Sequence, residues 1–404
     1  MATPPISPVT DVLGDNEPQL EDGIALCLSG GGYRAMLFHL GSIWRLAEMG
    51  FFDPRDRSAN LPDGTTRAIG QIQRISSVSG GSIVSALLGM SWNQIQFGTP
   101  GALDRFQKLV VRPICDLSGI SLAGTDFRGA VAVIGDILLP GSVNDHVAAA
   151  YDKHLYKGAT LQALPDAPRF VINASNLQSG ALMRFMKPYI RDWRVGEIRD
   201  TSKVSLAKAV AASSAFPPIL APATFKFADT DYTPRSGVAN FQGPPYTTEP
   251  TLADGGVYDN LGLETVYKRY RTLLVSNAGA PFAEQPEVHH DWARLGQRVI
   301  ELIDNQVGSL RKRLLVQSFQ QRARYGAFWD ISQAINAFKL SDSLTCPMAS
   351  TQLLAHLGTD LSAKDAGVRS RLINWGYGIA DTAVRAHLDR AAQPAPKFPL
   401  PGGV

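Results

Sequence analysis

Short apolar runs bounded by turn residues alternate along the chain with longer segments in which apolar residues recur every three or four positions. Four short runs have the length and composition of buried strands: Gly23–Leu28, Arg74–Val78, Arg169–Ala174 and Thr272–Ser276. Three longer runs show the helical repeat: Ala35–Glu48, Trp292–Arg324 and Leu361–Asp389. Strands that alternate with helices predict a three-layer α/β/α fold, in which a mainly parallel central sheet is covered on both faces.

The pattern also predicts how the chain is organised around that sheet. Residues 21–390 are expected to form a single domain, between flexible ends at 1–20 and 391–404 that are rich in proline, glycine and polar residues. A helical insertion between the second and third strands, 93–165, is a candidate cap over a site. After Pro281 the chain turns helical, which predicts a C-terminal helical extension over 283–390.

Composition narrows the class of protein. The 404 residues are 45% hydrophobic and 19% charged, which is typical of a globular protein. The net charge of +3 comes without a dense Lys/Arg run, which argues against nucleic-acid binding and only weakly favours an anionic membrane surface. Three widely spaced cysteines, Cys27, Cys115 and Cys346, indicate neither a disulfide framework nor a metal site.

The distribution of apolar and charged residues also bears on where in the cell the protein is found. We find neither the pattern of a secretory signal nor a run of about 18 apolar residues that could span a membrane. The sequence therefore predicts a cytoplasmic protein that touches membranes only peripherally, and leaves its oligomeric state open.

A glycine-rich motif, Ser29-Gly-Gly-Gly-Tyr-Arg34, follows the first predicted strand. Gly30, Gly31 and Gly32 let the backbone turn several N–H groups toward one point at the start of a helix, which suits an oxyanion. A plain strand-to-helix turn is the simpler alternative. A phosphate-binding loop would need Gly-Lys-Ser/Thr where Tyr33-Arg34-Ala35 stands, and Ala35 also breaks the dinucleotide fingerprint.

A serine-rich motif follows the second predicted strand. Ser79 lies between Ser77 and the pair Gly80-Gly81, which is similar to the nucleophile elbow Gly-x-Ser-x-Gly with serine in place of the leading glycine. In such an elbow small residues let the strand and the following helix approach each other closely. The alternative is a serine-rich helix cap without a catalytic role.

An acidic motif, Asp254-Gly255-Gly256, follows a segment rich in glycine, proline, threonine and tyrosine, Phe225–Glu249, which predicts a hairpin or long loop. Two glycines after an aspartate at a strand end place a carboxylate in a sharp turn. An Asp-Gly turn is also common in ordinary loops.

The three motifs in this order resemble the patatin-like phospholipases, and the glycine loop is also similar to that of the eukaryotic cytosolic phospholipases. The resemblance extends from Ile24 to about Phe282 and includes Lys208–Pro218 and Leu274–Pro281. It implies Ser79 as nucleophile and Asp254 as base. It further implies an oxyanion hole at Gly30, Gly31, Gly32 and Arg34, support of the site by Ser77, Gly80, Gly81, Gly255 and Gly256, and no metal or organic cofactor.

The implied activity is hydrolysis of carboxylic esters in lipids, as by a phospholipase A or lysophospholipase, through an acyl-enzyme on Ser79. An aspartate can act as the base only if burial raises its pKa. Two alternatives stay open: a carboxylesterase with a Ser-Asp-His triad using His289 or His290, which we interpret as surface residues, and a catalytically silent lipid-binding module.

Apolar residues of the insertion offer a candidate acyl pocket or membrane contact, although burial in the core is the better interpretation. They are Phe97, Phe106, Leu109, Val110, Val111, Ile114 and the run 131–139.

Overall fold

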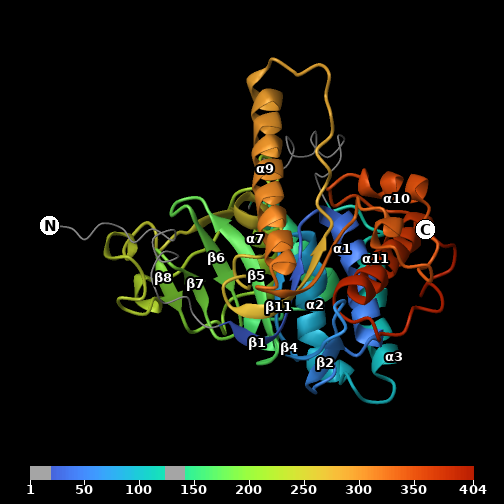
Figure 1. Ribbon diagram of the computed structural model, residues 1–404. Helices are drawn as coiled ribbons and strands as arrows, with labels where there is room; N and C mark the ends of the chain where they lie inside the picture. Colours follow the sequence, from blue (N-terminus) through green and yellow to red (C-terminus); the bar gives the residue numbers. More distant parts are fainter. Residues whose placement is uncertain (1–19, 123–141) are drawn as a thin grey trace.

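The computed structural model describes residues 20–122 and 142–404, which fold around one ten-stranded sheet (Figure 1). Five neighbouring strands run parallel, in the order β12 (Tyr325–Asp330), β11 (Tyr270–Asn277), β1 (Glu21–Leu28), β4 (Ile72–Ser77) and β5 (Arg169–Asn176). Four of these are the strands predicted from sequence, so the expectation of an α/β fold with a parallel core is confirmed.

Beyond β5 the sheet changes direction, which the apolar runs did not predict. The added strands are short and antiparallel: β6 (Ala181–Phe185), β7 (Ile190–Asp192) and β8 (Gly196–Ile198). The strand that ends at Asp254, β10 (Thr251–Asp254), also pairs with β5 in antiparallel fashion and with β9 (Ala223–Thr224). Residues 225–249 form the predicted loop between β9 and β10, with two 3₁₀ turns, Asp229–Asp231 and Ala239–Phe241. A separate hairpin joins β2 (Arg57–Asn60) to β3 (Thr66–Gly70).

One face of the sheet carries the main hydrophobic core. Ile24, Leu26 and Leu28 of β1 point into it, because alternate side chains of a strand face opposite sides. Three long helices cover this face: α1 (Gly32–Glu48), α2 (Gly80–Ile95) and α11 (Ala366–His387), together with the shorter α7 (Leu206–Ser213) and α10 (Met348–Ala355). Helix α1 is buried along almost its entire length between the sheet and α11.

The other face has a smaller core. Ala25 and Cys27 of β1 pack there against the segment after the Asp-Gly-Gly motif and against Leu315 of α9 (Trp292–Gln320). The short helix α8 (Gly256–Asp259) lies on the same side. Only the C-terminal part of α9 rests on the sheet, and its N-terminal part projects away from the body beside the extended chain that leads to it (Figure 1).

The described part of the predicted cap insertion packs into the main core. It holds α3 (Ala102–Phe106), α4 (Arg112–Leu117), α6 (Val143–Tyr151), and the π-helical turns Gln107–Val111 and Asp152–Tyr156. Phe97, Phe106, Val110, Val111 and Ile114 are buried, and Leu109 packs against the same cluster. These residues therefore serve the core, as interpreted, whereas the apolar run 131–139 lies outside the described residues.

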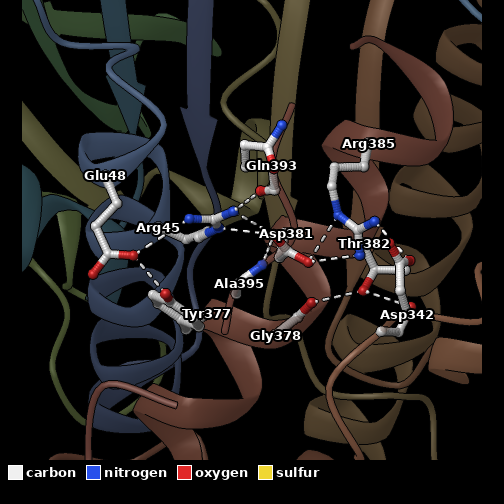
Figure 2. Close-up of polar contacts among 11 residues, drawn as sticks. Arg45, Glu48, Asp342, Tyr377, Gly378, Asp381, Thr382, Arg385, Gln393 and Ala395 are labelled. Carbon is white, nitrogen blue, oxygen red and sulfur yellow. Dashed lines mark hydrogen bonds and ion pairs between the residues drawn. The ribbon is translucent and has the colours of Figure 1, made fainter. Parts of the chain in front are cut away.

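The tail 391–404, predicted as a flexible end, is anchored instead. Asp381 of α11 is buried between Arg45 and Arg385, and it also accepts a hydrogen bond from the Ala395 amide at 3.1 Å (Figure 2). Arg45 donates to the Gln393 carbonyl, and the Asn374 side chain to the carbonyls of Leu400 and Gly403. The composition of the tail did not reveal these partners because they all lie on distant helices. The predicted flexible start 1–20 lies, except for Leu20, outside the described residues.

Candidate active site

The three sequence motifs meet at one end of the sheet, although more than 200 residues separate the first from the last. The glycine loop follows β1, Ser79 follows β4, and Asp254 ends β10. A cavity of about 560 Å³ opens there, and Gly31, Gly32, Ser79 and Asp254 all lie on its wall. Cavities of this size hold small organic ligands.

Ser79 occupies a strained elbow between β4 and α2. Its backbone has φ 50° and ψ −120°, a conformation that a non-glycine residue adopts only when the surroundings impose it. A Cβ on Gly80 would lie 2.1 Å from the Gly32 carbonyl oxygen, and one on Gly81 would lie 2.5 Å from that of Leu28. Both glycines are therefore needed for the close approach of the elbow to the glycine loop.

Serines from three elements support the elbow: Ser77 of β4, Ser82 of α2 and Ser213 of α7. The Ser79 amide donates a hydrogen bond to Ser213 Oγ at 3.0 Å, and Ser213 Oγ is 2.9 Å from Ser82 Oγ. Ser77 Oγ donates to the Val171 carbonyl and accepts from Ser82 Oγ. Ser77 stands where the elbow motif has its leading glycine, and it fits there because its hydroxyl is hydrogen-bonded inside the core.

Asp254 is the carboxylate that faces Ser79. Its side chain is buried and accepts a hydrogen bond on Oδ1 from the Gly256 amide at 2.7 Å, and the nearby Ser79 hydroxyl acts to lower its pKa. Burial raises the pKa of Asp254 to about 7, with a further upward contribution from the like charge of Asp304. A Cβ on Gly255 would lie 2.4 Å from the Asn173 carbonyl oxygen, so this turn has no room for a larger residue. The carboxyl group is thus poised to exchange a proton near neutral pH.

The three glycines of the loop differ in what their amides contact. The Gly30 amide points toward Asn260 and lies 3.2 Å from its carbonyl oxygen and 3.1 Å from its Oδ1. No described residue accepts a hydrogen bond from the amides of Gly31 or Gly32, which line the cavity with φ 139° and 59°. Two free donors therefore lie on the cavity wall beside Ser79.

Arg34 lies beneath the loop. Its buried guanidinium donates to the carbonyls of Ala278, Ala355 and Leu357 at 2.6–3.0 Å. Burial lowers the pKa of Arg34 to about 10. Arg34 is not among the residues that line the cavity, and its hydrogen bonds tie the glycine loop to the chain after β11 and to the segment before α11.

Histidines lie away from the reacting groups. His289 and His290 are exposed on the extended chain before α9, and no described histidine lies on the cavity wall. His39, which the sequence did not single out, is buried behind the glycine loop, with Nδ1 2.8 Å from Ser276 Oγ and Nε2 2.9 Å from the Ser29 carbonyl oxygen. Burial lowers the pKa of His39 to about 3, so its ring is neutral and has a structural role.

Three residues of the site were missed by sequence reasoning. Asn260 and Ser213 hold the glycine loop and the elbow, and Asp304 on α9 faces the cavity. Asn260 and Ser213 have weak signals, since Asn260 stands close after the Asp-Gly-Gly motif and Ser213 lies within Lys208–Pro218, whereas Asp304 is brought in only by the fold. Across residues 20–122 and 142–404, no cluster of three or more His, Cys, Asp or Glu side chains is placed to hold a metal ion.

Comparison with known proteins identifies the class. The family model for patatin-like phospholipase matches residues 26–267, which is 242 of the 404 residues. The chain therefore belongs to the patatin-like phospholipase family, which supports lipid hydrolysis as its activity. No curated protein matches it.

Among solved structures, the chain is similar to human GIVD cytosolic phospholipase A2. One structure, at 12% identity, has a TM-score of 0.36 and covers 68% of this chain and 50% of the other. A second, in complex with methyl gamma-linolenyl fluorophosphonate inhibitor and terbium chloride, is also 12% identical, has a TM-score of 0.44 and covers 89% and 57%. The chain thus spans little more than half the length of these proteins.

Proposed function

We propose that this protein hydrolyses carboxylic esters of lipids through an acyl-enzyme on Ser79, with Asp254 as the base. One observation carries the proposal: the strained Ser79 and the buried carboxyl group of Asp254 share the wall of one cavity, and the pKa of that carboxyl group is about 7. A base with a pKa near the working pH combines a useful deprotonated fraction with real affinity for the proton.

In the acylation step the Ser79 oxygen attacks the ester carbonyl while Asp254 takes its proton. The negative oxygen that develops on the carbonyl is best stabilised by fixed donors in a site that excludes water. The free amides of Gly31 and Gly32 are those donors, while Gly30 and Arg34 act indirectly by holding the loop in shape. Protonated Asp254 then returns the proton to the alcohol or lysolipid as it leaves.

Deacylation repeats the sequence with water as the attacking group. Asp254 takes a proton from water, the resulting hydroxide attacks the acyl carbonyl, and the free fatty acid leaves as the proton returns to Ser79. The cavity wall beyond the reacting groups is mostly apolar, with Phe216, Ile219, Leu220 and Phe282 among its residues. This wall supports an acyl chain as the group that is bound, and no step needs a metal or an organic cofactor.

The two alternatives make different predictions. A Ser-Asp-His triad would need His289 or His290 to reach Ser79, but both are exposed on the approach to α9. A silent lipid-binding module would have no reason to keep a strained elbow, a buried aspartate and free amides in one cavity. Both observations favour the dyad.

Labelling with a fluorophosphonate probe tests the proposal. We expect covalent labelling of the wild type and of the His289→Ala/His290→Ala double variant, and none of Ser79→Ala. Hydrolysis of a short p-nitrophenyl ester and of phospholipid vesicles should be lost in both Ser79→Ala and Asp254→Asn. An unlabelled wild type would favour the silent module, and loss of hydrolysis in the folded histidine double variant would favour the triad.

A further inference from the structure

The cavity beside Ser79 is lined by two chemically different segments. Residues 216–220 contribute apolar side chains, among them Phe216 and Ile219. Helix α9, which like the other described helices is not both long and apolar enough to cross a membrane, contributes polar ones. They are Gln297, Arg298, Glu301, Asp304 and Asn305. The two segments therefore suit the two parts of an ester, an apolar acyl chain and a polar alcohol.

The alcohol of the ester leaves next to Asp254 in the proposed mechanism. Asp254 takes the proton of Ser79 and returns it to the alcohol oxygen, so this oxygen has to come within hydrogen-bond reach of the carboxyl group. Asp304 lines the same cavity and acts on Asp254 as a like charge. The part of the substrate closest to Asp304 at the reacting centre is therefore the alcohol.

The other charged side chains that α9 and its neighbours bring to the cavity have partners of their own. Arg298 is the one basic residue that the described part of the chain contributes to the cavity wall. Its guanidinium pairs with Glu301 at 3.2 Å and donates to the Ala283 carbonyl at 2.7 Å. Asp360 is paired with Lys364 at 2.9 Å. Among the described residues, no basic side chain on the wall is left free to bind an anion.

Asp304 differs because its half-buried carboxylate has no partner. Within residues 20–122 and 142–404, no group forms a hydrogen bond or an ion pair with it. Lys312 acts to lower the pKa of Asp304, but its ammonium group pairs with Asp330 at 3.4 Å. Burial outweighs this effect and raises the pKa of Asp304 to about 6, so the group is ionised at pH 8. An unpaired carboxylate of this kind attracts a cation and repels another anion.

We propose that Asp304 is a specificity-determining residue that favours esters of cationic alcohols over those of neutral alcohols and disfavours esters whose alcohol carries a phosphate. Asp304 in this way narrows the substrate class of the proposed function, on which this inference rests. A phosphate on the alcohol would meet an unpaired carboxylate and no free basic side chain. Esters of choline-type alcohols and neutral glycerides therefore fit the cavity better than an anionic lipid such as a lysophosphatidate.

The free amides of Gly31 and Gly32 do not change this preference. They lie on the wall beside Ser79, where the carbonyl oxygen of the ester has to bind while Ser79 attacks. A phosphate bound at these amides would keep the ester carbonyl out. The amides therefore cannot offset the charge of a phosphorylated alcohol during the reaction.

Three short soluble esters with one acyl group test the inference: butyrylcholine, monobutyrin and butyrylglycerol phosphate. Their alcohols are cationic, neutral and anionic, and their hydrolysis is measured at pH 8 and low ionic strength. Relative to monobutyrin, Asp304→Asn should lower kcat/KM for butyrylcholine and raise it for butyrylglycerol phosphate, each by about tenfold, because one unit charge is removed from a partly buried site. A ratio between two esters is unaffected by any change in the base, since Asp254 serves all three.

A matched control and a second measurement accompany this comparison. Asp116→Asn removes the same charge from an exposed position on α4 and should leave both ratios unchanged. Added salt requires no variant, because it screens charges in the wild type. We expect salt to move the wild-type ratios toward those of Asp304→Asn.

The inference and the proposed function fail in different ways. Ratios that are unchanged in Asp304→Asn, ratios that shift equally in Asp116→Asn, or wild-type ratios that salt leaves unaltered would each overturn the role of Asp304. Monobutyrin would still be hydrolysed in these cases, so the proposed function would stand. Wild-type protein that hydrolyses none of the three esters would overturn the proposed function itself, and the inference with it.

Discussion

The substitution Asp254→Asn should abolish hydrolysis and at the same time stabilise the folded protein. An asparagine keeps the shape of the side chain and can still accept the 2.7 Å hydrogen bond from the Gly256 amide. It cannot ionise, so it avoids the cost of a charge in a buried position. A catalytic residue that is strained or buried for its function often reduces stability in this way.

The size of the effect follows from the pKa. Burial raises the pKa of Asp254 from 3.8 to about 7, a difference of about three units, or about 4 kcal/mol at about 1.4 kcal/mol per unit. Between these two pKa values the unfolded chain has lost the proton and the folded chain still holds it. Wild-type stability therefore falls as pH rises through this window, and the contribution of Asp254 changes by about 2–3 kcal/mol between pH 5 and pH 8.

Urea unfolding of the wild type and Asp254→Asn at several pH values measures this contribution, since the other titrating groups are shared. We expect the advantage of the variant to grow from pH 5 to pH 8 and then level off. The pH dependence of activity alone is less decisive, because a histidine base would give a similar acid limb. A stability difference that stays constant from pH 5 to pH 8 would refute the assignment of a raised pKa to Asp254.

Two further substitutions probe the surroundings of the site. Asp304→Asn removes a like charge that raises the pKa of Asp254, so the acid limb of kcat/KM for a soluble ester should move to lower pH; an unmoved limb would show that the two carboxylates do not interact. Asp381→Ala leaves two buried arginines without their shared partner and should lower the free energy of unfolding in urea by about 3–5 kcal/mol. The matched variant is Asp342→Ala, which removes a 54% exposed partner of Arg385 and should lower it by about 1 kcal/mol or less. Equal losses for these two variants would contradict the importance of burial.

The central strands and the long helices could be predicted because their apolar periodicity is local. The strand predicted over Gly23–Leu28 is β1, and the helix predicted from Ala35 starts three residues earlier, at Gly32. The antiparallel strands β7 and β8 have only three residues each, too few to show a period. The tail could not be placed for a different reason, since its order comes from partners on α1 and α11.

The candidate active site also has a part that could be predicted from the sequence and a part that could not. Ser79 and Asp254 could be proposed because the three glycine-marked motifs, taken together and in this order, resemble those of the patatin-like phospholipases. The cavity wall could not be predicted, because α9 and the residues 216–220 reach it only through the folded sheet. The described residues of the insertion 93–165, the candidate cap, pack into the core, and α9 flanks the cavity.

The number of free amide donors in the glycine loop could not be predicted from its sequence motif. Three successive glycines suggest three amides for an oxyanion, but the Gly30 amide is directed at Asn260, which follows the Asp-Gly-Gly motif. That contact joins the loop before α1 to the turn that carries Asp254, so the donors and the base are held in one rigid unit. Arg34 fixes the same loop from below through three carbonyls. The amides that stay free, Gly31 and Gly32, are therefore defined by what holds their neighbours, and the loop depends on the Asp-Gly-Gly turn for its shape.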